Sequence, residues 1–278
     1  MHGQVTKQSN TTRPRFMMAG IAMIPIVAIG AWWMASSSVT RDASPISHIG
    51  QTSNHSYDIE SDQDAHKPIA GGDLVARFQA IQNDRAPRQR APSAASSNPF
   101  PHIPRSRAGL SLEHDPFGAH SVAEQAWLDR HGYPNALQMA EYPVASDEKL
   151  QMAADAGDAV ARTLLDFRHF ESGVEGAEDS LLYAAAMGNS YALELLASFH
   201  SGSRRGDPVF GYALSKVLEW QGNYAVSMLR EVGMRTPLST RDRLQAEAEA
   251  LALFNQILEF RRSTPDAPPS VDPRPESG

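Results

Sequence analysis

Three variants of one pattern run through the chain: AADAGDAVARTLL at residues 153–165, AAAMGNSYALELL at residues 184–196 and LEWQGNYAVSMLR at residues 218–230. Superimposing Gly157, Gly188 and Gly222 gives spacings of 31 and 34 residues. A helix–turn–helix repeat has a period of about 34 residues. Such a unit is too small to bury its own apolar face, so successive units stack. The sequence therefore predicts an all-α fold, a short α-solenoid of helix–turn–helix repeats with capping helices.

The aligned segments place small or apolar residues at equivalent positions around each glycine. These positions are Ala153 and Ala184 before the glycine, then Ala161, Ala192 and Val226, then Leu164, Leu195 and Leu229. A glycine at a helix end adopts positive φ without a steric penalty, so the chain can reverse there. The neighbouring alanines allow two helix backbones to approach closely, which indicates a structural role for the pattern.

Residues 153–157 and 184–188 have the form Ala-Ala-x-x-Gly followed by alanine and leucine at fixed offsets. This pattern resembles the Sel-one-like repeat family, a branch of the tetratricopeptide-like helical repeats. The resemblance covers residues 146–262, and the third unit departs from it with Leu218 and Glu219 in place of the alanine pair. It implies a scaffold that binds a protein or peptide partner, without naming the partner.

Capping helices are expected on both sides of the repeats. Ser121 and Glu124 fit a capping box that starts a helix through Trp127, and a second short helix follows Tyr133. Trp127 and Tyr133 are expected in the core of this N-terminal cap. At the other end, a helix from Thr240 carries one apolar stripe, which we expect to face the array: Leu244, Ala248, Leu251, Phe254 and Leu258. The repeat domain is thus predicted at 118–262.

The N-terminal region has the pattern of a membrane anchor. Residues 16–35, FMMAGIAMIPIVAIGAWWMA, contain no charge and would span about 30 Å as a helix, the thickness of a bilayer core. Lys7, Arg13 and Arg15 precede the stretch, and positive flanks stay inside. We therefore expect a single-pass protein of the bacterial inner membrane, with residues 1–15 cytoplasmic and the repeat domain periplasmic.

The same segment could instead be a secretory signal, which would release a soluble binding protein. Ala35 is small enough to precede a cleavage site, but Trp33 is too large for the position two residues before it. The anchor is the preferred interpretation.

Two segments are predicted to be disordered: a linker at 36–117 and a tail at 263–278, both rich in proline and polar residues. Within the linker, Leu74, Phe78 and Ile81 share one face of a short helix. This helix could dock on a partner, or it could fray or rest on the chain's own repeats. The second interpretation is preferred.

Composition excludes several classes of function. The net charge of −7 argues against general nucleic-acid binding, which needs a basic surface. The chain has no cysteine, which excludes disulfides, cysteine nucleophiles and thiolate metal sites. Nucleophile elbows, phosphate-binding loops, dinucleotide fingerprints and zinc-protease motifs are absent. We expect no enzymatic activity and no cofactor.

The alternative from the enzyme class is a periplasmic hydrolase or metal-binding protein. His169 and His200 each lie twelve residues after a repeat glycine, so stacking could bring them together. Catalytic zinc generally takes three protein ligands, however, and no third ligand has suitable spacing. Helix capping is the preferred role for both histidines.

Partner-binding residues are expected on helix faces that point away from the paired helix. The candidates are Arg162, Arg168, Tyr191, Glu194 and Tyr224. For any one of them individually, exposed, solvated surface is the preferred interpretation.

Overall fold

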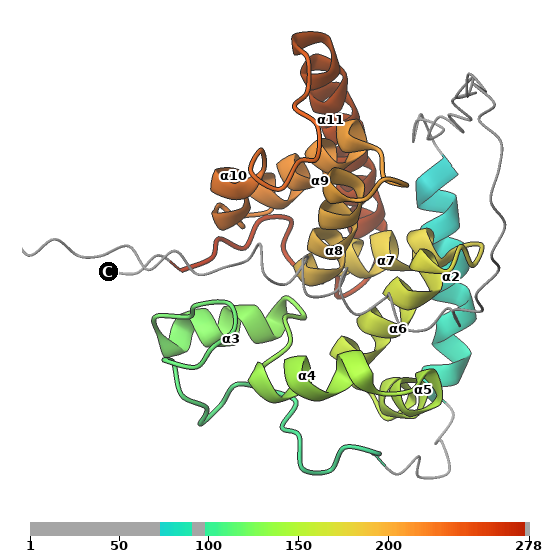
Figure 1. The fold of residues 1–278 in the computed structure, drawn as a ribbon. Coiled ribbons are helices and arrows are strands. Elements are labelled where there is room, and N and C mark those ends of the chain that lie inside the picture. Colours follow the sequence, from blue (N-terminus) through green and yellow to red (C-terminus); the bar gives the residue numbers. More distant parts are fainter. Residues whose placement is uncertain (1–72, 91–97, 276–278) are drawn as a thin grey trace, which may run out of the picture.

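The computed structural model describes residues 73–90 and 98–275, and this part of the chain is all-helical (Figure 1). Its elements are α2 (Asp73–Arg90), α3 (Val122–Arg130), α4 (Ala136–Glu141), the short 3-10 helix η1 (Tyr142–Val144), α5 (Asp147–Asp155), α6 (Ala159–Glu171), α7 (Ala177–Ala186), α8 (Ser190–Gly202), α9 (Pro208–Trp220), α10 (Ala225–Leu229) and α11 (Thr240–Ser263). The expected anchor at 16–35 lies outside the described residues. Among the helices described, none is both long and apolar enough to cross a membrane.

The repeat glycines sit at the turns between paired helices, as the sequence predicts. Gly157, Gly188 and Gly222 have φ values of 90°, 95° and 108°, which glycine adopts without strain. In all three turns, the residue after the glycine donates its N–H to the carbonyl five residues before it, at 2.9–3.0 Å: Asp158 to Ala153, Asn189 to Ala184 and Asn223 to Leu218. This is the Schellman geometry that ends a helix and reverses the chain.

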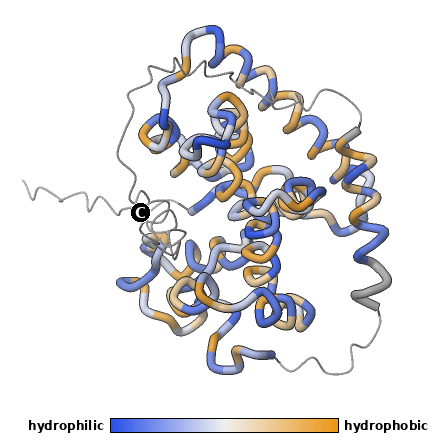
Figure 2. Tube along the Cα trace, turned by 45° about the vertical axis from the view of Figure 1, so that its right-hand side comes forward, coloured by the Kyte–Doolittle hydropathy of each residue, from blue (hydrophilic) through white to orange (hydrophobic). Residues whose placement is uncertain are grey.

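The helix pairs α5–α6, α7–α8 and α9–α10 pack on one another in chain order, which gives the described part a solenoid-like arrangement. The aligned alanines Ala153, Ala161 and Ala192 are fully buried, so the helices approach closely at those points. Hydrophobic residues alternate with hydrophilic ones along the helices (Figure 2), as expected for amphipathic segments that bury one face.

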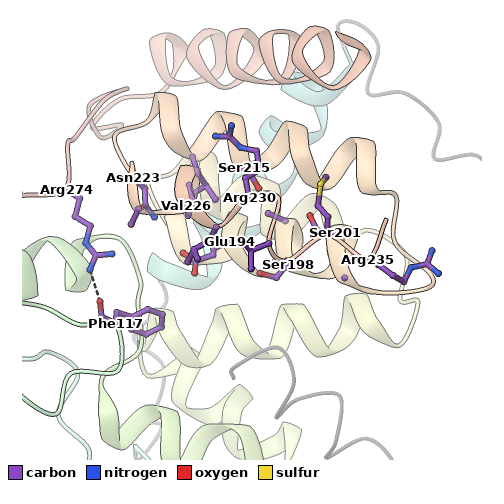
Figure 3. Close-up of a pocket in the computed structure, with 18 residues that line it drawn as sticks. Phe117, Glu194, Ser198, Ser201, Ser215, Asn223, Val226, Arg230, Arg235 and Arg274 are labelled. Carbon is purple, nitrogen blue, oxygen red and sulfur yellow. Dashed lines mark hydrogen bonds between the residues drawn. The ribbon is translucent and has the colours of Figure 1, made fainter. Parts of the chain in front are cut away.

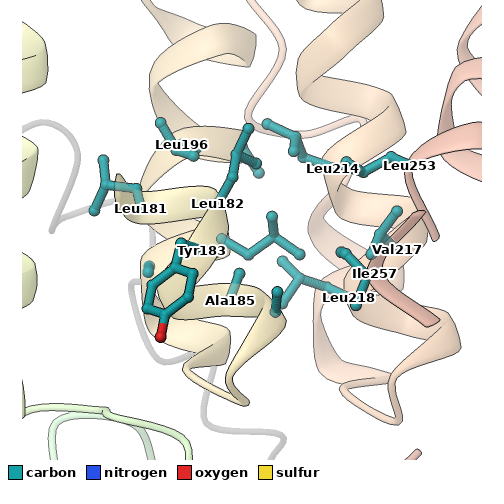
Figure 4. Packing of buried hydrophobic residues seen from close by; sticks show 14 of the residues in the cluster. Leu181, Leu182, Tyr183, Ala185, Leu196, Leu214, Val217, Leu218, Leu253 and Ile257 are labelled. Carbon is teal, nitrogen blue, oxygen red and sulfur yellow. The ribbon is translucent and has the colours of Figure 1, made fainter. Parts of the chain in front are cut away.

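The largest core cluster lies where α7, α8, α9 and α11 meet. Figure 4 shows leucines of α7 and α8 packed toward α9 and α11. The labelled members are Leu181, Leu182, Tyr183, Ala185, Leu196, Leu214, Val217, Leu218, Leu253 and Ile257. A second cluster surrounds Trp127 and Tyr133, which are 1% and 2% exposed. The expected N-terminal cap is therefore present, with both aromatic residues in its core.

Helix α11 begins after Ser239, within the expected start at 237–240, but the predicted stripe faces the domain only in part: Phe254 packs against the core and Leu258 is half-buried. The residues that contact the domain are Ala246, Ala250, Leu253, Ile257 and Phe260. Leu244, Ala248 and Leu251 of the predicted stripe are exposed. The helix carries two apolar faces, and periodicity alone cannot choose between them. The ring of Phe260 fits between Phe78 and Tyr183, at centroid distances of 5.2 and 5.8 Å, which favours the observed face.

Helix α2 corrects the prediction of a disordered linker across 36–117. It packs against α7 and α11, with Leu74 and Phe78 completely buried. Arg77 pairs with Asp179, which adds a charged contact at the edge. The helix thus rests on the chain's own repeats, because its apolar face completes their core.

Residues 98–117, also predicted to be disordered, pack against the N-terminal cap. Phe100, Ile103 and Phe117 are buried. Arg107 is only 1% exposed, and its guanidinium donates to the carboxylates and carbonyls around it, at 2.7–2.8 Å: Asp115, Asp129, Tyr133 O and Pro134 O. The composition of this segment, rich in proline and arginine, predicts disorder. Its order comes instead from the burial of Arg107, whose acceptors Asp129, Tyr133 O and Pro134 O lie far away in the sequence. Residues 36–72 and 91–97 of the predicted linker are outside the described part.

The tail is also ordered as far as residue 275. It crosses the turns of the second and third helix pairs: Pro268 contacts Gly188, and the backbone of Asp272 and Arg274 donates to Gln221 O and Gly222 O at 3.0 Å. The glycines are required here because a Cβ at residue 222 would lie 2.7 Å from the tail backbone. The predicted disorder at 263–275 is wrong, because the tail finds its hydrogen-bond partners on the turns rather than in a helix of its own.

Candidate binding groove beneath helix α10

A groove of about 410 Å³ lies between α8, α9 and the α10 segment (Figure 3). Its volume is in the range of about 300–1,000 Å³ that is typical of ligand sites. Phe117 and Arg274 close one end, where Arg274 Nη2 donates to Phe117 O at 2.8 Å. The backbone N–H of Arg235 donates to Ser201 O at 3.0 Å, which fixes the 230–235 segment along the other end.

The walls of the groove are mainly apolar. They consist of Ala197 on α8, Leu218 on α9, and Val226 and Leu229 on α10. Val226 and Leu229 occupy repeat positions whose equivalents are buried in earlier units, such as Ala192 and Leu164. Because α10 has only five residues and packs mainly on α9, the space between α8 and α10 stays open in the described part of the chain.

The floor of the groove carries a chain of hydrogen bonds. The Tyr133 hydroxyl donates to Glu194 Oε2 at 2.6 Å, and Asn223 Nδ2 donates to the Tyr133 oxygen at 2.7 Å. Removal from water raises the pKa of Glu194, although the Tyr133 hydrogen bond and the charge of Arg274 act in the opposite direction. Burial, together with the neighbouring carboxylate, also raises the pKa of Tyr133. At the floor, burial therefore disfavours the ionised form of Glu194, and the Tyr133 hydroxyl keeps its proton.

Asn223 leaves one acceptor unused at this floor. Its side chain is 1% exposed, and Oδ1 has no hydrogen-bond partner among the described residues. The equivalent residues of the earlier units cap the next helix: Asp158 accepts from Ala161 N, and Asn189 accepts from Ala192 N. Asn223 does not cap α10, which has no side-chain cap. A buried acceptor without a donor costs about 1–3 kcal/mol.

The arginines around the groove are largely neutralised by the domain itself. Arg230 pairs with Glu219, and Arg274 Nε donates to Glu124 at 2.7 Å. The groove therefore presents apolar walls above an acceptor floor, which suits an apolar side chain next to a hydrogen-bond donor.

Two of the predicted partner-binding residues hold the helices together instead. Arg162 pairs with Asp155 at 3.0 Å, across the α5–α6 turn. Arg168 binds the end of η1 and the start of α5, with acceptors at 2.6–3.0 Å: Tyr142 O, Pro143 O, Ala145 O and the Asp147 carboxylate. Both guanidinium groups are therefore occupied within the domain.

The other three candidates lie in three different environments. Tyr191 is 4% exposed and packs against Phe117 and Tyr133, so it belongs to the core rather than to a surface. Tyr224 is exposed beside α10. Glu194 alone of the five lines the groove. The prediction failed for Tyr191 because the N-terminal segment, expected to be disordered, covers that face of α8.

The two aligned histidines do not share one environment. The His200 ring is buried against Phe170, Phe199 and Phe210. Its Nδ1 accepts from Asp207 N at 3.2 Å, and its Nε2 lies 3.2 Å from Glu178 Oε1. His169 is half-buried near the end of α6. In the part of the chain that the structure describes, no group of three or more side chains is arranged to hold a metal ion. The hydrolase or metal alternative receives no support from these contacts.

Sequence reasoning missed Asn223, Phe117 and Arg274 as groove residues, and Tyr133 as the buried residue that holds Glu194 and Asn223. The sequence shows Asp or Asn after each repeat glycine, but only the structure shows that Asn223 does not cap the helix that follows. The contributions of Phe117 and Arg274 depend on long-range folding of segments whose composition resembles disorder.

Comparison with protein-family models, curated proteins and solved structures found no match for this chain. The class that the described residues define is all-helical: stacked helix pairs with an apolar groove at the third pair.

Proposed function

We propose that this protein is a membrane-anchored periplasmic adaptor that binds a protein or peptide partner in the groove beneath α10. The observation that carries the proposal is an otherwise apolar groove with the Glu194 carboxylate at its floor, held by the Tyr133 hydroxyl. A partner segment would place an apolar side chain against Val226 and Leu229 and donate an N–H to Glu194. A backbone amide or a lysine ammonium would supply this donor.

The three helix pairs are proposed to be Sel-one-like repeats. The identical turn geometry at Gly157, Gly188 and Gly222 supports this assignment, as do the buried alanines at aligned positions. Arrays of this kind bind partners through surfaces that successive units build together. The third unit would be specialised for binding, because its second helix is short and leaves the groove open.

The location is proposed from the sequence of residues 16–35. An uncleaved apolar segment with positive charges before it would hold the protein in the inner membrane with the helical domain outside the cytoplasm. Fractionation of cells that produce the full chain tests this point. Recovery in the membrane fraction at full mass supports the anchor, whereas a soluble form smaller by about 4 kDa supports signal cleavage.

Site-specific photo-crosslinking tests the binding function directly. Ser198 is an exposed groove residue on α8, so a photoreactive amino acid at this position would leave the packing intact. In living cells, we expect the full chain with the photoreactive residue at 198 to form a defined adduct with one partner polypeptide. Mass spectrometry of the adduct should place the crosslink next to an apolar residue of the partner.

The matched control carries the same photoreactive residue at Val174, an exposed position in the α6–α7 loop. Ser198→Arg, which fills the groove with a charged side chain, should abolish partner binding, while Val174→Arg should not. The proposal fails if position 198 yields no adduct, or if positions 198 and 174 capture the same proteins.

A further inference from the structure

Helix α11 exposes an apolar stripe on the side that faces away from the domain. Leu244 and Leu251 are 66% and 54% exposed, Ala248 is exposed, and Leu258 is half-buried. No described segment covers this stripe. At about 100° per residue, it lies on the opposite side of the helix from the buried residues, among them Leu253 and Ile257. The domain therefore packs against one face of α11 and leaves its outer apolar face accessible.

The exposed stripe has the spacing of a helix–helix interface. Leu244, Ala248, Leu251, Asn255 and Leu258 follow one another at intervals of four, three, four and three residues. This is the heptad spacing that keeps one seam facing a second helix, with leucine at every d-type position. A solvent-facing helix needs no such pattern, because polar residues at those positions would serve equally well.

We propose that α11 pairs antiparallel with α11 of a second copy of this chain, so that the protein assembles as a two-fold symmetric dimer. In the antiparallel pair, Leu251 of each copy lies opposite Ala248 of the other. Large and small side chains then alternate and let the helices approach to about 8–10 Å. The contact is self-complementary, as a two-fold axis requires.

Charge complementarity sets the direction of pairing. Arg241 and Glu259 are exposed at opposite ends of α11, on the same side of the stripe, and neither has an ion-pair partner among the described residues. In the antiparallel arrangement, Arg241 of each copy lies beside Glu259 of the other. A parallel arrangement would instead place Arg241 against Arg241 and Arg262 against Arg262, at a repulsive cost. The charges therefore favour the antiparallel dimer.

The absence of cysteine makes the proposal directly testable, because any introduced thiol is the only one in the chain. The full-length Leu251→Cys protein, in membranes of the cells that produce it, should form a covalent dimer with a short bismaleimide. Residue 251 lies close to its own copy across the two-fold axis. Leu244→Cys should react far less, since the two copies of residue 244 are separated by roughly 16 Å along the helix axis. Val144→Cys, exposed on η1, is the matched control.

Each result decides the proposal. Dimer formation at position 251, but neither at 244 nor at 144, supports the antiparallel pair. Equal crosslinking at 244 and 251 overturns the antiparallel order, and equal crosslinking at 144 overturns the interface. A monomer in which Cys at 251 resists maleimide labelling would show that another part of the chain covers the stripe, which also overturns the proposal.

Sedimentation of the full chain in mild detergent provides a second readout. The unmodified protein and the Val144→Arg control should have the mass of two chains, whereas Leu251→Arg should have the mass of one. Because Leu251 makes no core contact, circular dichroism of this variant should remain unchanged. A single-chain mass for the unmodified protein across micromolar concentrations overturns the dimer.

Discussion

The indole N–H of Trp127 donates to the main-chain carbonyl of Asp272 at 2.8 Å, across 145 residues of sequence. The contact joins the first capping helix to the C-terminal tail. Arg274 strengthens the junction, since its Nε donates to Glu124 of the same helix at 2.7 Å. The two ends of the repeat array are therefore tied to each other by a tail that also crosses the glycine turns.

Deleting residues 264–278 should destabilise the domain. The deletion removes the Trp127 hydrogen bond, the Arg274–Glu124 pair and two backbone bonds to the third turn. At roughly 1 kcal/mol for each of these four interactions, we expect the free energy of unfolding to fall by about 4 kcal/mol. Urea denaturation monitored by tryptophan fluorescence measures the change. A shorter deletion that starts after Pro275 keeps every one of these contacts and should leave the midpoint unaltered; equal midpoints for both deletions would contradict the proposed role of the tail.

Replacing Arg107 by methionine should lower the free energy of unfolding of the domain by several kilocalories per mole. The substitution leaves Asp115 buried without its cationic partner and removes the donors that serve the carbonyls of Tyr133 and Pro134. Breaking a buried ion pair from one side typically costs about 3–5 kcal/mol. Arg105→Met provides the control, because Arg105 is exposed and should change stability by less than about 0.5 kcal/mol. Thermal unfolding measures the two variants. If both lose the same stability, residues 98–117 do not pack as an ordered segment.

Gly222→Ala should be more harmful than Gly173→Ala, although both glycines follow a helix and have positive φ. An added Cβ at residue 173 meets no atom within 4 Å, so that variant loses only about 1–2 kcal/mol to left-handed strain. At residue 222, the Cβ would also lie 2.7 Å from the tail backbone at Asp272 and Pro273. The difference between their chemical denaturation midpoints isolates the close approach of the tail. If the two midpoints shift equally, the tail does not pass over the turn.

The repeat turns could be predicted because local chemistry determines them. A glycine flanked by helical residues, with Asp or Asn next in sequence, indicates a chain reversal without any knowledge of distant contacts. Gly157, Gly188 and Gly222 all confirm this. The helix starts are local in the same way: the structure places a cap at Ser121, as predicted, and one at Ser239, within the predicted start at 237–240.

The segments that failed prediction obtain their order from distant partners. Arg107 is buried only because Asp129 and the carbonyl of Pro134 lie around it, and α2 is stable only where α7 and α11 cover its face. Helix α11 shows a different limit. Both faces of α11 carry apolar residues, so the hydrophobic periodicity of its sequence could not indicate which face packs against the domain. The groove was missed for the same reason: Glu194 was identified, but the residues that close the site come from segments expected to be disordered.

Glu194→Gln should change the pH dependence of stability in a defined direction. Burial raises the pKa of Glu194 above its ordinary value of 4.5. Below pH 4.5, the carboxyl is protonated in both the folded and the unfolded chain, so it contributes no pH dependence. As the pH rises above 4.5, the unfolded chain loses this proton before the folded chain does, and stability falls until the folded pKa is passed. Glutamine has no proton to lose, and its carbonyl can still accept from Tyr133. The free energy of unfolding of Glu194→Gln, relative to the unmodified protein, should therefore increase from pH 4 to pH 7, whereas exposed Glu247→Gln should show no comparable trend. Urea denaturation at several pH values measures this difference, and a decrease over the same range would show that the groove stabilises the ionised carboxylate instead.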